Sequence, residues 1–247
     1  MTNKYERVLE RLRTELADTG VECSPFKVGW YNTVVAAPFR LPYHEDTLAI
    51  LLISTPAMFE NLFVPFLSQM KPGCILDPLD QCMKELCARL CALFPTEEVD
   101  VLHDFDLDPA TRRPKILVQT AGHVSGATYY YQRADVQPEH WPPSTSIYGV
   151  AMHPLYGGWF AFRGALVFSK IKGEGLIQRK PLDCVPTREK RIELLEAFNF
   201  RWQDWSYRDV FDGQVQDRYS ADQRDYFLTE PAKRGPLLMK YLGNGQP

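Results

Sequence analysis

Apolar residues recur at helical spacing in four stretches of the chain, and the residues before each stretch predict where the helix begins. The first stretch opens with Asn3, which pairs with Glu6 as a capping box, and Gly20 is expected to end it. The second opens with Thr55 as its predicted cap. Pro65 lies inside the second stretch and predicts a kink, because proline cannot donate the helical hydrogen bond.

The third and fourth stretches carry similar start signals. Asp77 precedes Pro78, whose missing N–H costs nothing at the first position of a helix. The cysteines of this third helix are expected to pack in the core. Thr187 caps the fourth helix, and an aromatic, arginine-rich segment follows it at residues 200–208.

Strand patterns fill much of the remaining chain. Residues 26–53 predict short strands broken by prolines, with 48–53 as a buried strand. Residues 99–107 alternate between apolar and acidic side chains, which is typical of a strand with one face in water. Residues 147–168 predict two strands joined as a hairpin by the sequence His-Pro-Leu-Tyr-Gly-Gly.

The most distinctive composition lies at residues 112–132. An apolar run at 116–118 predicts a strand that leads to Gln119, and three tyrosines follow at 129–131. Between them come small residues, which let a large group approach the backbone: Ala121, Gly122, Ser125, Gly126 and Ala127. Amides and phenols together suit a broad, flat ligand with polar edges. The alternative is a core strand, a glycine turn and a strand of tyrosines.

Composition limits the classes of function. The 247 residues are 45% hydrophobic and 24% charged, which predicts one globular domain over residues 1–247 with a flexible tail from about residue 235. The net charge of -3 argues against a nucleic-acid partner. The longest apolar runs are too short to cross a bilayer, and the N-terminus has no signal-peptide pattern. We therefore expect a cytoplasmic protein without a membrane partner, and its six cysteines are expected to be free thiols.

Common catalytic and metal motifs do not occur. The sequence Gly122-His-Val-Ser-Gly126 places its serine one position too late for a serine hydrolase, and no C-x-x-C pair exists for a metal. The aspartate repeat that begins at Asp104 lacks the glycine and glutamate of a calcium loop. His123 and His153 are expected to be structural. Arg163 interrupts an apolar strand and needs an anion or several carbonyls, with an internal salt bridge as the alternative.

Several aromatic and proline strings occur in an order that resembles the cobalamin-processing family of methylmalonic aciduria and homocystinuria type C. The strings are Trp30-Tyr-Asn32, Ser54-Thr-Pro-Ala-Met-Phe59, Asp77-Pro-x-Asp-Gln-Cys82, Arg112-Arg-Pro-Lys-Ile-Leu with Gln119-Thr-Ala, Tyr129-Tyr-Tyr-Gln-Arg133, Gly157-Gly-Trp-Phe-Ala161, Asp183-Cys-Val-Pro-Thr-Arg188 and Trp205-x-Tyr-Arg-Asp209. They cover nearly the whole chain, so the resemblance is specific.

The resemblance implies an α+β fold similar to flavin-dependent nitroreductases, with a mixed sheet and flanking helices. It implies an enzyme of vitamin B12 processing that binds cobalamin with its nucleotide base displaced from cobalt and removes the upper ligand. Alkyl groups pass to the thiol of glutathione, and cyanide leaves by reduction with FMN or FAD and NADPH. The type D trafficking protein and methionine synthase are the implied recipients of the cofactor.

The resemblance also implies binding residues, position by position. The implied cobalamin contacts are Asp104, Ile116, Leu117, Val118, Gln119, Tyr130, Tyr131, Gln132, Ala151 and Phe162. The implied glutathione contacts are Arg163, Arg208 and Arg234, whose guanidinium groups can pair with carboxylates and favour a thiolate. No metal-ligating side chain is implied, and the catalytic side chains are unknown. Leu155 departs from the arginine that the family can carry, and the long Pro-rich tail of some members is missing.

Three hypotheses follow from these observations. The leading one is a glutathione-dependent alkylcobalamin dealkylase that also decyanates cyanocobalamin. The alternatives are a non-catalytic cobalamin carrier and an ordinary flavin-dependent nitroreductase. Turnover of methylcobalamin separates the first from the second, and flavin retained through purification marks the third.

Overall fold

The computed structural model describes residues 3–70 and 77–242. Its main sheet contains β1 (Val21–Lys27), β2 (Thr47–Ser54), β6 (Ala161–Lys172) and β3 (Val99–Leu102), in that order. Every adjacent pair in this sheet is antiparallel, so the expectation of a mixed sheet is wrong for the described strands. Strands β2 and β3 therefore run in the same direction on either side of β6, and the chain crosses over between them through the helices that follow β2 in the sequence.

Strand β2 lies in the centre of the sheet and is buried on both faces. Leu48, Ile50 and Leu52 face one core cluster, and the residues between them face another. All six residues at 48–53 are no more than 1% exposed, so the predicted buried strand is confirmed. This continuous apolar run is typical of a strand covered on both sides.

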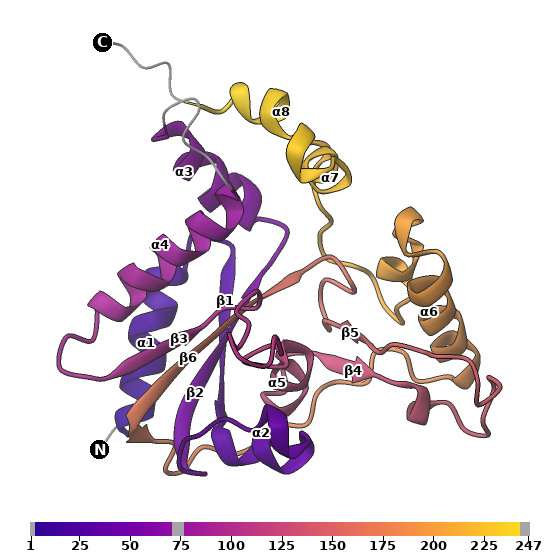
Figure 1. The fold of residues 1–247 in the computed structure, drawn as a ribbon, viewed down its shortest axis with the longest axis horizontal. Coiled ribbons are helices and arrows are strands. Elements are labelled where there is room, and N and C mark those ends of the chain that lie inside the picture. Colours follow the sequence, from indigo (N-terminus) through magenta and orange to yellow (C-terminus); the bar gives the residue numbers. More distant parts are fainter. Residues whose placement is uncertain (1–2, 71–76, 243–247) are drawn as a thin grey trace.

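Helices cover both faces of the main sheet (Figure 1). The first face carries α1 (Lys4–Leu16), the π-helix η2 (Phe59–Phe63), α3 (Val64–Ser68) and α4 (Pro78–Ala92). The second face carries α2 (Val28–Val34) and α5 (Val118–Val124). The fold is therefore an α+β arrangement with flanking helices, as expected.

A smaller unit lies beside the main sheet and has its own core. Strands β4 (Tyr129–Tyr131) and β5 (Val150–Met152) pair antiparallel, and α6 (Arg188–Phe200) packs against them. The chain then forms α7 (Ala221–Leu228) and α8 (Gly235–Met239), which lie near α3 in Figure 1. Tyr226 and Leu238 from these two helices belong to the first core cluster. Helix α8 thus occupies the start of the segment that was expected to be flexible.

Short 3-10 turns connect these elements. They are η1 (Ala37–Phe39), η3 (Arg133–Asp135), η4 (Trp202–Asp204), η5 (Ser206–Asp209) and η6 (Pro231–Lys233). The arginine-rich segment after α6 therefore forms η4 and η5, and not a continued helix.

Most of the predicted helix starts are confirmed. The backbone N–H of Asn3 donates to the Glu6 carboxylate at 2.8 Å, and the Thr187 hydroxyl accepts from the backbone N–H of Lys190 at 3.3 Å. Helix α4 begins at Pro78 as predicted. Thr55 is different, because its hydroxyl donates to the carbonyl of Gly20 at 3.0 Å and caps no helix.

Several strand predictions are wrong in instructive ways. Residues 28–34 form α2, and the expected strand at 116–118 gives way to α5. Strand β3 ends at Leu102, because the Asp106 carboxylate accepts from the backbone N–H of His103 and turns the chain. The expected hairpin at 147–168 does not form, since β5 pairs with β4 whereas β6 pairs with β2 and β3.

Candidate functional site

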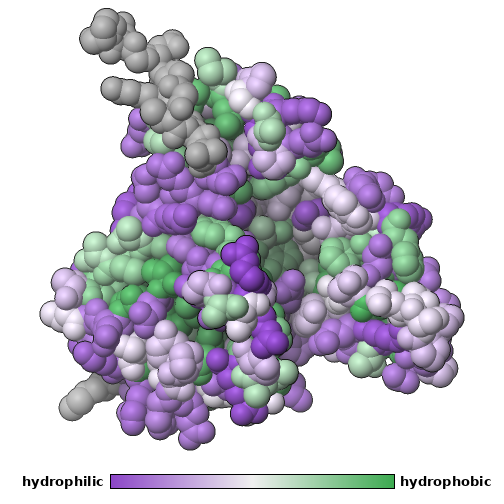
Figure 2. All heavy atoms as spheres, viewed as in Figure 1, coloured by the Kyte–Doolittle hydropathy of each residue, from purple (hydrophilic) through white to green (hydrophobic). Residues whose placement is uncertain are grey.

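A cavity of about 640 Å³ opens between α5, the small sheet and the segment that includes α6, η4 and η5. Its lining residues are Gln119, Tyr130, Tyr148, Gly149, Phe198, Asn199, Trp202 and Tyr207. A smaller cavity of about 180 Å³ shares Gln119, Gly149, Phe198 and Tyr207, and adds Ala151, Phe162 and Arg208 among others. Figure 2 shows a hollow in this face of the molecule. We call the two cavities together the α5–α6 cavity.

Five residues implied by the resemblance line the α5–α6 cavity. They are Gln119, Tyr130, Ala151, Phe162 and Arg208. They come from α5, β4, β5, β6 and η5, so elements far apart in the sequence meet here. The lining combines amides with aromatic rings, which is the chemistry that binds a large ligand with apolar faces and polar edges.

The strand geometry of β4 separates its three tyrosines. Tyr130 lines the cavity, whereas the rings of Tyr129 and Tyr131 stack on the other face with centroids 4.3 Å apart. Tyr131 is fully buried; its hydroxyl donates to Asp183 at 2.7 Å and accepts from the backbone N–H of Val185 at 2.8 Å. Successive side chains of a strand point to opposite faces, so Tyr130 and Tyr131 cannot both point into the cavity.

The small residues of the central stretch serve the protein's own packing. A Cβ on Gly122 would lie 2.7 Å from the Phe162 ring, and one on Gly126 would lie 2.8 Å from the carbonyl oxygen of Arg179. The large group that approaches this backbone is therefore another part of the chain. Phe162 gains its place beside the cavity because Gly122 has no side chain.

His123 makes contacts within the protein of the kind expected of a structural histidine. Its Nδ1 accepts from the backbone N–H of Tyr130 at 3.1 Å, and its ring meets the Tyr129 ring edge-on at 5.0 Å. Burial lowers the pKa of His123, which favours the neutral ring that this hydrogen bond requires. The histidine thereby fixes the start of β4.

The other implied cobalamin contacts do not line the α5–α6 cavity. Ile116, Leu117 and Val118 belong to the core cluster that also includes Tyr130 and Phe162. The backbone N–H of Leu117 donates to the Tyr31 hydroxyl at 2.9 Å, which fixes the entry to α5. Two further residues lie in loops: Gln132 is exposed after β4, and Asp104 is half-buried after β3.

The three implied glutathione contacts surround α7 and the residues before it. The guanidinium of Arg208 lies 5.2 Å from the centroid of the Tyr219 ring, and that of Arg234 lies 4.4 Å from the centroid of the Tyr226 ring. Arg163 carries a charge that acts on the same Tyr226 hydroxyl. Tyr219 and Tyr226 both pack against Phe227, so these aromatic rings connect the arginines.

Arg208 is enclosed by aromatic rings. Its guanidinium carbon lies 4.9 Å from the centroid of Trp205, 5.2 Å from that of Tyr207 and 5.6 Å from that of Trp159. One guanidinium nitrogen, Nη1, donates to the carbonyl of Gly158. The Nε atom is buried and has no hydrogen-bond partner within residues 3–70 and 77–242. Buried donors normally have a partner, so this arginine has capacity for an anion.

Arg163 is buried at 7% exposure, and its Nε donates to the Ser54 hydroxyl at 2.8 Å. The described part of the chain gives it no ion pair, although Asp80 and Asp104 are near enough to act on its charge. Burial is the main cause that raises the pKa of both carboxyl groups. The internal salt bridge considered from the sequence is therefore not formed.

Sequence reasoning missed the aromatic and amide residues on the far side of the cavity. The backbone N–H of Tyr148 donates to Asn199 Oδ1 at 2.8 Å, and Asn199 Nδ2 donates to the Tyr148 carbonyl at 2.9 Å. This pair fixes the loop before β5 to the end of α6. Tyr148 is 73% exposed and Trp202 is 55% exposed, which is unusual for rings of this size. The arginine-rich aromatic segment at 200–208 was the available signal.

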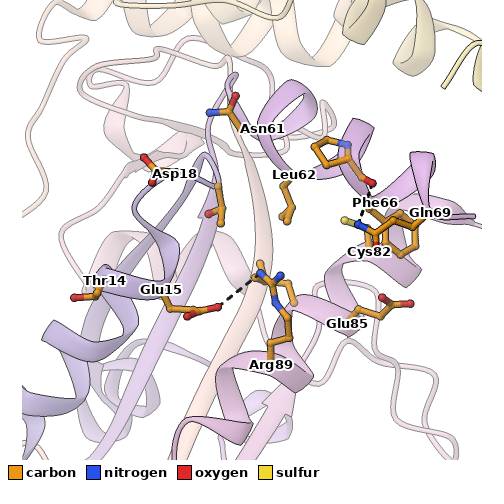
Figure 3. Close-up of a pocket in the computed structure, with 13 residues that line it drawn as sticks. Thr14, Glu15, Asp18, Asn61, Leu62, Phe66, Gln69, Cys82, Glu85 and Arg89 are labelled. Carbon is orange, nitrogen blue, oxygen red and sulfur yellow. Dashed lines mark hydrogen bonds and ion pairs between the residues drawn. The ribbon is translucent and has the colours of Figure 1, made fainter. Parts of the chain in front are cut away.

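A separate cavity of about 340 Å³ lies between α1, η2, α3 and α4 (Figure 3). Glu15 and Arg89 approach to 4.0 Å across it, and Gln69 donates to the carbonyl of Pro65 at 3.3 Å. Burial raises the pKa of Cys82, another lining residue, to about 12, so its thiol stays protonated. None of the implied binding residues lines this cavity.

The described residues contain neither a candidate metal cluster nor a candidate membrane-spanning helix. No group of three or more His, Cys, Asp or Glu side chains within residues 3–70 and 77–242 could hold a metal ion. Over the same residues, no helix combines the length and the apolar composition needed to cross a bilayer. Cys23, Cys82, Cys87, Cys91 and Cys184 are free thiols, whereas Cys74 lies outside the described residues.

Comparison with known proteins gives consistent results. The sequence profile of the methylmalonic aciduria and homocystinuria type C family matches residues 20–238. A protein of Gallus gallus named cyanocobalamin reductase / alkylcobalamin dealkylase is 50% identical over 233 residues, which are 94% of this chain and 96% of that protein. The Homo sapiens protein of the same name is 45% identical over 96% of this chain and 83% of its own length.

A solved structure is also similar. The crystal structure of a B12-trafficking protein CblC of C. elegans, described as a human MMACHC homologue, superposes with a TM-score of 0.87. Its sequence is 32% identical, and the alignment covers 98% of both chains. The similarity therefore extends over both sheets and the helices around them.

Proposed function

Because this chain belongs to the methylmalonic aciduria and homocystinuria type C family, we propose that it is an enzyme of vitamin B12 processing. It binds cobalamin base-off in the α5–α6 cavity and removes the upper axial ligand. Alkylcobalamins lose their alkyl group to glutathione, and cyanocobalamin loses cyanide by reduction. The product then passes to the type D protein and methionine synthase in the cytosol.

The observation that carries this proposal is the composition of the α5–α6 cavity. Gln119 supplies an amide that can bind the amide fringe of a corrin, and Tyr130, Trp202 and Tyr207 supply aromatic faces for its apolar surface. The volume of about 640 Å³ lies within the range of small-molecule and cofactor sites. No histidine lines this cavity, so no described lining residue offers imidazole to the lower face of cobalt.

Arg208 supports the glutathione part of the proposal. It lines the smaller cavity beside Phe162, and its guanidinium has an unpartnered buried donor. A glutathione carboxylate would accept from this guanidinium, and the positive charge would favour the thiolate. The thiol proton goes to solvent. The thiolate sulfur then attacks the cobalt-bound carbon, the S–C bond forms, the Co–C bond breaks, and its electron pair remains on cobalt.

Decyanation needs a different electron source. A bound FMN or FAD, reduced in turn by NADPH, would supply the one electron that reduces cobalt, and cyanide would leave with its own electron pair. Base-off binding makes this reduction easier, since loss of an axial donor stabilises electron-rich cobalt. We also propose that the architecture is related to flavin-dependent nitroreductases, which a comparison of strand order and helix placement will test.

The decisive experiment mixes the protein with methylcobalamin and glutathione under nitrogen. Turnover changes the cobalt spectrum and yields the methyl thioether of glutathione, measured by mass spectrometry. A carrier would shift the spectrum on binding and give no thioether. A nitroreductase would retain flavin through purification and leave the spectrum of methylcobalamin unchanged. Binding that leaves the base-on spectrum unaltered would contradict the base-off part of the proposal.

A further inference from the structure

The turn at residues 153–158 fits against the backbone of Arg208. The N–H of Gly158 donates to the Arg208 carbonyl at 2.9 Å, and Arg208 Nη1 donates to the Gly158 carbonyl. A Cβ on Gly157 would lie 2.5 Å from the Arg208 carbonyl oxygen, and one on Gly158 would lie 2.7 Å from the Arg208 Cα. Gly157 and Gly158 therefore pack so closely against Arg208 that a side chain at either glycine would clash with it.

The turn is closed by its own hydrogen bonds. The backbone N–H of His153 donates to the Gly157 carbonyl at 2.7 Å, and the N–H of Gly157 donates to the His153 carbonyl at 3.0 Å. Gly157 has a φ of 57°, a conformation that residues with a side chain rarely adopt. His153 is thus hydrogen-bonded directly to one of the two glycines that contact Arg208.

A single carboxylate on the edge strand β1 anchors this turn from the other side. Glu22 Oε2 lies 3.4 Å from His153 Nε2, and the hydroxyl of Tyr156 donates to Glu22 Oε1 at 3.2 Å. His153 Nδ1 accepts from the backbone N–H of Leu155 at 3.2 Å, so a neutral ring carries its proton on Nε2, the atom that faces Glu22. The His153 ring is 5% exposed and stacks on Tyr156 at 4.8 Å.

Two observations indicate that the anchor is fully formed. Interaction with His153 is the largest cause that lowers the pKa of Glu22, so the carboxylate is ionised at neutral pH. The same glutamate contacts two side chains of one turn, since it accepts from Tyr156 and lies 3.4 Å from His153 Nε2. Glu22 touches neither cavity of the proposed site.

We propose that Glu22 is a positioning residue for glutathione: through His153 and Tyr156 it holds the turn at 153–158, and the turn holds the guanidinium of Arg208 where it meets a substrate carboxylate. This inference rests on the proposed function, because it assumes that Arg208 binds glutathione. Glu22 belongs to none of the strings that carry the family resemblance.

The first test compares steady-state kinetics of Glu22→Ala with those of a matched control, Leu155→Ala. Leu155 lies in the same turn with its side chain 49% exposed, and only its backbone takes part in the hydrogen bonds of the turn. Glu22→Ala is expected to raise the KM for glutathione about fivefold and to change kcat less than about twofold. Flavin-driven decyanation and the control variant are expected to match the wild type.

The second test is a double-mutant cycle with Arg208→Ala. If Glu22 acts through Arg208, the double variant has the same KM for glutathione as Arg208→Ala alone. The inference would be overturned if Glu22→Ala raised the KM equally in the wild-type and Arg208→Ala backgrounds. It would also be overturned if Glu22→Ala left the KM of the wild type unchanged, or if it reduced decyanation in parallel. Should Glu22→Ala fold poorly by its thermal midpoint, the isosteric Glu22→Gln replaces it in the same cycle.

The two proposals fail in different ways. If the wild-type protein forms no methyl thioether from methylcobalamin and glutathione, the proposed function is wrong. If the wild type forms it and Glu22→Ala leaves the KM for glutathione unchanged, the proposed function stands and the positioning role is wrong.

Discussion

The guanidinium of Arg163 lies at a point in the fold where a positive charge is costly. It is 7% exposed on β6, and its one hydrogen bond within the described residues goes to the Ser54 hydroxyl. A buried cation without an ion pair normally alters the ionisation of neighbouring groups or binds a ligand. The carboxyl groups of Asp80 and Asp104 offset only part of the cost of burying this positive charge. Burial raises the pKa of each carboxyl group and so disfavours its negatively charged form.

Replacing Arg163 by Gln is therefore expected to affect dealkylation more than decyanation. The variant loses one charged hydrogen-bond partner for glutathione, about 1.5 to 3 kcal/mol of transition-state stabilisation. Glutathione-dependent dealkylation should fall roughly tenfold to a hundredfold. The measurement is both activities on one preparation whose thermal midpoint shows that it is folded, with exposed Arg7→Gln on α1 as the control. Equal losses in the two activities would assign Arg163 a structural role.

His123→Ala tests whether the histidine beside the cavity is structural. The substitution removes the acceptor for the Tyr130 N–H at 3.1 Å and leaves that donor half-buried, a loss of about 1 kcal/mol. Cobalamin affinity should weaken by less than about tenfold, and the bound spectrum should stay base-off. A titration followed by visible absorption measures both. Complete loss of the base-off spectrum would identify His123 as a cobalt ligand instead.

At the scale of whole elements, α6 determines the far wall of the cavity. Its C-terminal turn carries Phe198 and Asn199, and Asn199 holds the backbone of Tyr148 with two hydrogen bonds. Leu194 and Leu195 are fully buried against the small sheet. The position of the wall therefore depends on how well α6 is formed from its first turn onward.

Thr187→Ala should weaken that helix. The Thr187 hydroxyl caps α6, and loss of such a cap costs about 0.5 to 2 kcal/mol. We expect a lower thermal midpoint and a modest loss of cobalamin affinity, measured by calorimetry and by spectral titration. Thr187→Ser keeps the hydroxyl and is expected to behave as the wild type. A normal midpoint in the alanine variant would show that packing alone fixes this helix.

The start signals of helices were readable from the sequence because they are local. Asn3, Pro78 and Thr187 lie within a few residues of the backbone groups that they affect, so α1, α4 and α6 were predicted with nearly correct starts. The central strand β2 was equally clear from its unbroken apolar run. The core of the main sheet could thus be predicted in outline.

Pairing partners were not readable in the same way. Residues 150–152 and 161–172 are both strands, and the turn between them is tight, yet each pairs with a distant segment. The choice depends on Tyr129–Tyr131 and on β2, which lie far away in the chain. Successive side chains of β4 point to opposite faces, so Tyr130 and Tyr131 lie on different sides of the strand. Which of the two lines the cavity became clear only from the structure.

At the scale of the whole molecule, the site lies where the main sheet, the small sheet and the C-terminal segment meet. Phe162 comes from the first, Tyr130 and Ala151 from the second, and Arg208 from the third. The resemblance supplied these residues from the sequence, but their meeting place depends on long-range packing that no local pattern encodes. A ligand in this position contacts all three parts and should stabilise the whole fold by mass action.

Asp104, an implied cobalamin contact that does not line the α5–α6 cavity, affects the acid–base stability of the molecule. It lies half-buried after β3, and burial is the largest cause that raises its pKa above the ordinary 3.8, with Asp80 adding to the rise and Arg163 opposing it. The folded state therefore binds the proton of Asp104 more tightly than the unfolded chain does. Ionisation of this carboxyl group costs folding free energy above its raised pKa, and the cost disappears as the pH falls below it.

Asp104→Asn should consequently raise the thermal midpoint at pH 7 and weaken cobalamin binding. This compromise is expected where a group is retained for function rather than for stability. The midpoint difference between variant and wild type should shrink as the pH is lowered through the raised folded-state pKa toward 3.8. Calorimetry at several pH values measures this, with exposed Asp225→Asn on α7 as the control. A variant less stable than the wild type at pH 7 would mean that attraction to Arg163 outweighs the cost of burial, and Asp104 would then belong to the structural support of that arginine.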